Sequence, residues 1–405
     1  MAPEAGSGVQ ARGRGGSPLE VLRIFLRLGL TSFGGPVAHL GYFHNAFVVR
    51  RQWLDERAYA DLVALCQFLP GPASSQVGFS IGLIRAGYLG ALAAWAGFTL
   101  PSAIAMTLAA YGAGVLNGPA GEGLLHGLKL VAVAIVAQAV LSMARTLTPD
   151  KPRAAIAILA LMLMAFAPGG VSQIGAIVAG GLAGLAFCRQ EAEAAVDGGE
   201  APISRKMGLV FALAYFALLA LSFLPSRESA LAFVAAVYRS GALVFGGGHV
   251  VLPLLQGAVV APGWLPESAF LAGYGAAQAV PGPLFTFAAF LGAAANAPPG
   301  GVPGAALALV AIFLPGVLIL MGALPFWHAL RARAGARAAL AGVNAAVVGL
   351  LASALYDPVW RSAVGGPKDF AIAAAGFAGL VVWRAPPILV VVLTAAAGVA
   401  LGVAG

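Results

Sequence analysis

The strongest constraint on this chain is a near-continuous series of apolar segments, each roughly as long as a membrane-spanning helix. A bilayer core about 30 Å thick needs roughly 20 apolar residues for each helical crossing. Hydrophobic residues make up 60% of the sequence and charged residues only 9%, whereas a soluble domain is about a quarter charged. A water-soluble surface cannot be built from this composition. The sequence therefore predicts an all-α polytopic membrane protein.

The apolar blocks fall into two groups that flank a single extra block. We expect an N-terminal transporter repeat over 19–188 and a C-terminal repeat over 226–405, joined by one transmembrane helix at 207–225. A disordered cytoplasmic tail is predicted over 1–18 and a charged cytoplasmic linker over 189–206. The predicted blocks are 21–49, 58–84, 87–111, 123–144, 152–167 and 170–187, then 207–224, then 229–260, 268–296, 302–327, 339–357, 368–383 and 385–404.

The two groups share a sequence motif, which indicates that they are copies of one unit. Phe33-Gly34-Gly35-Pro36 with His39 is matched by Phe245-Gly246-Gly247-Gly248 with His249. The match then continues along both copies. The further aligned pairs are Trp53 with Trp264, Gln67 with Gln278, Pro70-Gly71-Pro72 with Pro281-Gly282-Pro283, and Gly127 with Gly342.

Basic residues in short loops predict the side on which each loop lies, because Lys and Arg favour the cytoplasm. In the first half the basic residues surround the first two blocks, and the loop at 112–121 has none. In the second half the loops at 257–266 and 296–304 have none, and the basic residues come later. Equivalent loops are therefore expected on opposite sides, so the halves are predicted to be inverted-topology repeats. This pattern rests on Arg50, Arg51, Arg57 and Arg85, and on Arg331, Arg333 and Arg337.

The first two blocks of the N-terminal half each contain a glycine-proline break. Basic residues flank both ends of each block, which favours re-entrant hairpins that return to the starting side; two long, kinked, full crossings are the alternative. Non-helical backbone at membrane depth is tolerated only where protein or a watery cavity satisfies it. Discontinuous helices in transporters lie at substrate sites. The paired breaks therefore predict a binding site.

The residues around the breaks suit an anion, because they offer hydrogen-bond donors and few carboxylates. The helix starts that follow the two Pro-Gly-Pro motifs would present free N–H groups. Lys129 lies inside an apolar block, where a cation is costly, and its counterpart is Asn344. Structural kinks, interhelical hydrogen bonds and snorkelling are the alternatives. The candidate substrate-binding residues are Gly34, Gly35, His39, Gln67, Gly71, Ser74, Ser75, Lys129, Gly246, Gly247, His249, Gln278, Gly282, Thr286 and Asn344.

Several classes of function are disfavoured by what the sequence lacks. Cation pumps need buried carboxylates, and the acidic residues here lie near block ends. There is no Walker A sequence, and no arrangement of nucleophile, metal ligands or paired carboxylates that predicts an enzyme. Cys66 and Cys188 have no Cys or His partner at metal-ligand spacing, so we expect no metal and no cofactor. The net charge of +8 comes from Lys and Arg residues in short loops, which set the orientation in the membrane. It therefore does not predict nucleic-acid binding.

The first motif set resembles the amino-terminal signature of the chromate ion transporter family. It comprises Phe33-Gly34-Gly35-Pro36 with His39, Trp53, Cys66-Gln67-Phe68-Leu69-Pro70-Gly71-Pro72 and Arg85-Ala86-Gly87. The second copy resembles that family's carboxy-terminal half, and the similarity covers nearly the whole chain beyond the tail.

The resemblance implies a bacterial inner-membrane carrier that exports chromate from the cytoplasm and confers resistance to it. We expect secondary transport by alternating access, with the N-terminus in the cytoplasm and the lipid bilayer as the main partner. Sulfate is the alternative substrate, because both ions are tetrahedral dianions with similar hydrogen-bonding surfaces. Import and an anion channel also stay open as alternatives, as does a homodimer.

Overall fold

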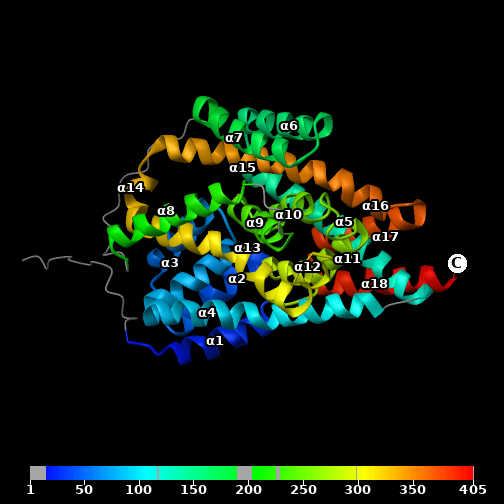
Figure 1. Ribbon diagram of the computed structural model, residues 1–405, viewed down its shortest axis with the longest axis horizontal. Coiled ribbons are helices and arrows are strands. Elements are labelled where there is room, and N and C mark those ends of the chain that lie inside the picture. Colours follow the sequence, from blue (N-terminus) through cyan, green and yellow to red (C-terminus); the bar gives the residue numbers. More distant parts are fainter. Residues whose placement is uncertain (1–14, 116–117, 189–202, 225–228, 298, 405) are drawn as a thin grey trace, which may run out of the picture.

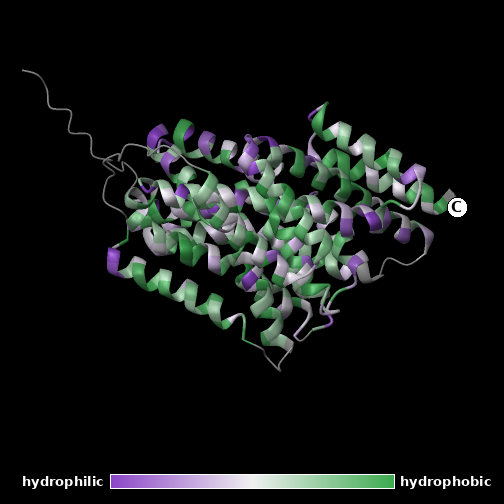
Figure 2. Cartoon of the chain, turned by 90° about the horizontal axis from the view of Figure 1, so that it is seen from above, coloured by the Kyte–Doolittle hydropathy of each residue, from purple (hydrophilic) through white to green (hydrophobic). Residues whose placement is uncertain are grey.

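The computed structural model describes residues 15–115, 118–188, 203–224, 229–297 and 299–404. Every regular element among them is a helix (Figure 1). Hydrophobic residues make up most of the helices, and many of the hydrophilic residues lie at helix ends and in loops (Figure 2). The predicted all-α polytopic membrane fold is confirmed. Five helical stretches are long and apolar enough to cross a membrane: Ala73–Gly112, Pro119–Leu147, Gly170–Phe187, Gly301–Phe326 and Ala334–Ala363.

The first apolar block is broken at its glycine motif. Helix α1 (Pro18–Thr31) begins where the Ser17 side chain accepts a hydrogen bond from the Glu20 amide, which is a standard N-terminal cap. It ends before Gly34, whose φ of 100° is accessible mainly to glycine. The chain resumes as α2 (Gly35–Phe43) and the π-helical turn η1 (His44–Arg50). Neither arm alone has the roughly 20 residues that a crossing needs.

The second block is broken at Pro70-Gly71-Pro72, between α3 (Glu56–Phe68) and α4 (Ala73–Val115). Helix α4 itself reverses at Ala86 and Gly87, where the backbone leaves the helical region. Its two arms pack so closely that a Cβ on Gly82 would collide with the Gly90 backbone. The predicted separation of blocks 58–84 and 87–111 is therefore present as a tight helical hairpin.

The ends of both broken blocks meet in one small cluster. The Arg85 guanidinium lies 3.2 Å from the Glu20 carboxylate and 4.7 Å from the centre of the Trp53 ring. Glu20 begins α1, Trp53 links η1 to α3, and Arg85 closes the first arm of α4. Both blocks thus start and finish at the same end of the protein. They are hairpins, and the alternative of two kinked full crossings is not what the structure contains.

The second half also contains two hairpins. Different side chains lie at their base, which is the end where the hairpins start and finish. The Trp264 ring packs on Phe233 with ring centres 5.4 Å apart, and the Trp264 carbonyl accepts a hydrogen bond from the Asn296 amide at 2.8 Å. These residues lie at the outer ends of the second pair of hairpins. The elements are α9 (Ser229–Ala242), η2 (Gly248–Val250), α10 (Val251–Val259), α11 (Glu267–Ala277), η3 (Leu284–Thr286), α12 (Phe287–Ala294) and α13 (Gly301–Ala323).

The two hairpin bases lie at opposite ends of the long second arm of α4. This arm starts beside Arg85 and extends roughly 35 Å at helical rise to Tyr111. The Tyr111 hydroxyl would lie 2.9 Å from a Cβ on Gly301, and Gly301 begins α13 just after the second base. Inverted repeats require this arrangement. The inverted topology itself stays a prediction.

The last helices of the two halves are interleaved. Helix α5 (Pro119–Leu147) packs against α17 (Pro367–Val381) and α18 (Pro387–Ala404). Helix α15 (Ala334–Ala354) packs in the same way against α6 (Lys151–Phe166) and α7 (Gly170–Phe187), as Figure 1 shows. Each half therefore completes the packing of the other. The remaining helical elements are α8 (Arg205–Leu221), η4 (Leu324–Phe326), α14 (Trp327–Arg331), η5 (Leu355–Trp360) and α16 (Arg361–Ala363).

Helix α8 occupies the position of the extra block predicted at 207–225. It packs against α9 and α13 of the second half. Most of the predicted linker, residues 189–202, and of the predicted tail, residues 1–14, lies outside the described residues.

The inverted topology can be tested with single cysteines at the two hairpin bases. Tyr88 and Pro299 are exposed and lie near opposite bases. We expect Tyr88→Cys to react with a membrane-impermeant maleimide only in inverted vesicles and Pro299→Cys only in intact cells. The unmodified chain is the control, because Cys66 and Cys188 are buried. Labelling of both positions from the same side would rule out inversion.

Candidate functional site

The tips of the hairpins from the two halves are joined by a reciprocal pair of backbone hydrogen bonds. The Gly71 amide donates to the Val244 carbonyl at 2.8 Å, and the Gly282 amide donates to the Ser32 carbonyl at 2.9 Å. Gly71 and Gly282 occupy equivalent positions in the aligned motifs. Ser32 and Val244 are also equivalent, because each directly precedes a Phe-Gly-Gly segment. The breaks of the two halves therefore meet, and both copies use the equivalent amide and carbonyl groups.

Close packing around the tips depends on glycine. Gly71 and Gly282 have φ values of 118° and 101°, which L side chains rarely adopt. A Cβ on Gly71 would lie 3.0 Å from Gly316 Cα, and one on Gly282 would lie 2.7 Å from Ser102 Oγ. Gly34, Gly35, Gly246 and Gly247 also have positive φ, as their predicted role in the breaks requires.

His39 supports one of these junctions from behind. Its side chain is fully buried, with Nε2 3.2 Å from the Ser32 carbonyl oxygen and Nδ1 3.3 Å from Ser74 Oγ. A carbonyl can only accept, so Nε2 carries the proton, and in the neutral imidazole Nδ1 then accepts from the Ser74 hydroxyl. The Ser32 carbonyl thus receives hydrogen bonds from both halves, and the structure brings His39 and Ser74 together as one unit.

The second-half counterparts have a different local arrangement. His249 Nδ1 lies 2.7 Å from the Tyr274 hydroxyl, and the Thr286 hydroxyl donates to the Pro283 carbonyl at 2.8 Å. Among the described residues, Ser75 Oγ and Gln278 Nε2 are buried without a hydrogen-bond partner. Such groups are costly to bury, and both belong to the candidate set.

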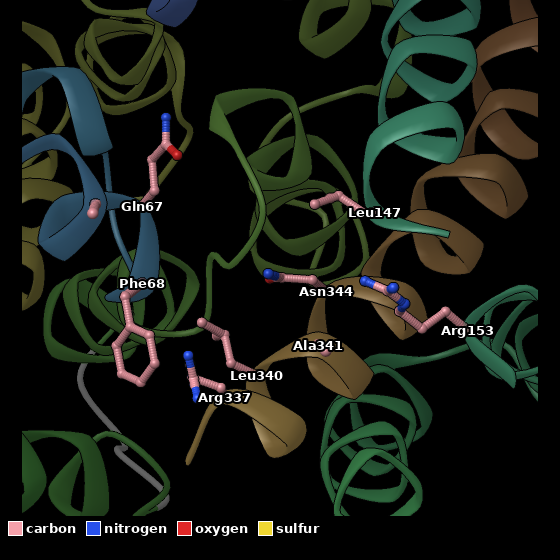
Figure 3. Close-up of a pocket in the computed structure, with 9 residues that line it drawn as sticks. Gln67, Phe68, Leu147, Arg153, Arg337, Leu340, Ala341 and Asn344 are labelled. Atoms are coloured by element: carbon pink, nitrogen blue, oxygen red, sulfur yellow. The ribbon is translucent and has the colours of Figure 1, made fainter. Parts of the chain in front are cut away.

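A cavity of about 300 Å³ lies beside the tips and is walled by both halves. Gln67 from α3 and Asn344 from α15 line it, together with two arginines that the sequence analysis did not place in the site. Figure 3 shows the Asn344 side chain between those of Arg153 and Arg337. The lining residues are Ala64, Gln67, Phe68, Leu147, Arg153, Arg337, Leu340, Ala341 and Asn344.

The polar groups of the cavity differ in how fully they are paired. Arg153 Nη2 lies 2.6 Å from the Asp150 carboxylate, and this hydrogen bonding lowers the pKa of Asp150. Asp150 also caps α6 by accepting from the Arg153 amide at 3.0 Å. Asn344 Oδ1 is buried without a partner and faces Gly246 of the second-half break, 3.4 Å from where a Cβ would be. Asn344 therefore lies between the cavity that it lines and that break.

Lys129 does not line this cavity. It is partly buried on α5, whereas its sequence counterpart Asn344 does line it. Of the predicted residues, the structure groups Gln67 with Asn344 and His39 with Ser74, and it places each tip glycine against the opposite half. The two halves are alike at the tips and differ beside them.

Comparison with known proteins identifies the family. The family model described as Chromate transporter matches residues 19–185 and 231–399, which are the two copies of the repeat. The chain belongs to the chromate transporter family. No solved structure gave a significant match.

Curated relatives in this chromate transporter family span most of the chain. A chromate transport protein of Pseudomonas aeruginosa is 29% identical over 92% of this chain and 89% of its own length. One of Cupriavidus metallidurans is 28% identical over 85% of this chain and 83% of its own. A probable chromate transport protein of Synechococcus elongatus is 26% identical over 90% and 95%.

The tip glycines give a direct test of the junction. We expect Gly71→Ala and Gly282→Ala each to destabilise the protein by about 1 to 3 kcal/mol, because a Cβ there is strained and meets the opposite half. A lower melting temperature of the purified protein would show this. Gly175→Ala is the matched control, since a Cβ on Gly175 in α7 meets no other atom within 4 Å. Equal melting temperatures in all three variants would contradict the proposed dependence on glycine.

Proposed function

We propose that this protein is a secondary transporter that exports chromate from the cytoplasm by alternating access and thereby confers chromate resistance. Membership of the chromate transporter family, matched in both copies of the repeat, supports the substrate. The reciprocal hydrogen bonds of Gly71 and Gly282 are the observation that carries the mechanism. They support the proposal that the two halves move relative to each other across the contact between the hairpin tips.

In this proposal the oxyanion binds where the tips separate. The helix starts after the two Pro-Gly-Pro motifs supply N–H donors, and a helix N-terminus favours an anion through its dipole. Ser74, Ser75 and Thr286 add hydroxyl groups beside these starts. In the present structure the tips are packed together, so access to the donors requires a relative movement of the halves. Such rocking about a central site is a recurring feature of inverted-repeat transporters.

The membrane potential favours export of a dianion. Moving one charge through 100 mV is worth about 2.3 kcal/mol, so a doubly charged oxyanion gains about twice that on leaving an inside-negative cell. The proposal places the protein in the bacterial inner membrane with its N-terminus, the tail at 1–18 and the linker at 189–206 in the cytoplasm. Basic loop residues support that orientation.

Direction and substrate can be separated by flux measurements in vesicles. We expect inverted vesicles with an imposed potential, positive inside, to accumulate radiolabelled chromate in a saturable way, because their lumen corresponds to the cell exterior. Right-side-out vesicles with chromate outside provide the control for import. Accumulation only in the right-side-out vesicles would contradict export, sulfate flux without chromate flux would change the substrate, and flux that never saturates would indicate a channel.

A second measurement concerns the polar side chains predicted to bind the oxyanion. We expect Gln67→Ala, Gln278→Ala and Lys129→Ala each to lower chromate resistance in cells that hold normal amounts of the protein, because each removes a donor from an apolar environment. Gly175→Ala serves again as the control. Resistance equal to that of the unmodified chain in all three variants would refute the site.

A further inference from the structure

Two arginines of the cavity are placed where helix polarity disfavours a cation. Arg153 lies in the first turn of α6, and Arg337 lies in the first turn of α15. The N-terminal end of a helix carries partial positive charge, so acidic residues and bound anions are favourable there and cations are not. Both helices nevertheless direct an arginine into the same cavity. An anion bound in the cavity would add to the Asp150 carboxylate, 2.6 Å from Arg153, in offsetting this placement.

The need for positive charge in the loops that set orientation does not by itself account for these two arginines. Lys151 and Arg333 lie within a few residues of them, in the same connections, and are exposed. They supply positive charge on that side without lining the cavity. Arg153, by contrast, has a side chain only 23% exposed. The charge that sets orientation and the charge that faces the cavity are therefore carried by different residues.

The lining of the cavity suits an oxyanion. Guanidinium groups present several N–H donors in a fixed plane and can bind two oxygens of one anion. The amides of Gln67 and Asn344 add further donors from α3 and α15. None of the described residues that line the cavity is acidic. Asp150 contacts Arg153 from outside this lining, and its side chain is 45% exposed, so solvent screens its charge.

The equivalent positions in the other copy of the repeat carry acids. Glu122 lies in the first turn of α5, the counterpart of α15, and aligns with Arg337. Asp369 has the same position in the first turn of α17 as Arg153 has in α6, and it pairs with His126 at 2.8 Å. These acids are the residues that helix polarity favours. The paired arginines therefore occur at one end of the protein only, and the equivalent positions of the other copy are acidic.

We infer that the cavity between α3, α6 and α15 is a binding vestibule for tetrahedral dianionic oxyanions, held by Arg153 and Arg337 with Gln67 and Asn344. The ligand class follows from the planar donors of two guanidinium groups and from amide donors that approach from several elements. The inference deepens the proposed function, on which it rests for the identity of the carried ion. It adds a capture site at the arginine end, ahead of the packed tips.

Equilibrium dialysis of the full-length purified protein with radiolabelled chromate tests the vestibule. We expect Arg153→Gln and Arg337→Gln each to raise the dissociation constant about tenfold or more, as expected for loss of a hydrogen bond to a charged group. Arg337→Lys should give an intermediate value, because it keeps the charge but loses the planar donors. Sulfate and molybdate should compete with chromate, and nitrate, a planar monoanion, should not. Arg333→Gln, a basic residue near the same helix start, should bind as the unmodified chain does.

Unchanged affinity in both glutamine variants would overturn the vestibule, even if the vesicles still export chromate. Arginine-dependent binding in a protein whose flux proves to be inward would uphold the vestibule and remove only the proposed direction. If one glutamine variant does not remain monodisperse on size-exclusion chromatography, the dissociation constant of the other glutamine variant decides the test.

Discussion

The structure depends on how two non-helical tips between apolar helices satisfy their backbone groups. An N–H or C=O group in a bilayer core finds no water, and leaving it unpaired costs several kcal/mol. Here the amides of Gly71 and Gly282 reach across to the carbonyls of Val244 and Ser32, so each half supplies what the other lacks. The breaks are stable only because the halves face each other. A hairpin pair separated from its counterpart would expose these groups to lipid.

Much of this arrangement could be predicted from sequence, because the signals are local. Apolar length gave the class of fold, and the paired glycine and proline motifs marked where helices end at Thr31, Phe68, Ala242 and Ala277. Proline forbids helical continuation and glycine permits positive φ, so a break needs no knowledge of the partner. Basic residues around both blocks also favoured hairpins, which the contact of Glu20, Trp53 and Arg85 confirms.

The cavity was harder to predict, because it is assembled from elements far apart in the sequence. Arg337 was interpreted only as an orientation signal and Arg153 was given no role, since a loop charge has no visible neighbour in a sequence. Their positions in first turns, against the helix dipole, were the available signal. Lys129 was conspicuous through its apolar flanks, yet it does not line the cavity. The free-energy cost of placing a cation in an apolar segment marks the residue as a candidate. It does not indicate which residues or cavity the side chain faces.

The interleaving of the last helices has a consequence for the order in which the protein can assemble. Gly123 and Gly127 of α5 pack against the backbone of Gly398 and Thr394 on α18, with no room for a Cβ at either glycine. Ribosomes make α18 long after α5, so this close-fitting face of α5 must wait in the bilayer until α18 has been made. Helix α15 has no such delay, because its partners α6 and α7 are made before it. The N-terminal half is thus the earlier to be synthesised and the later to be finished.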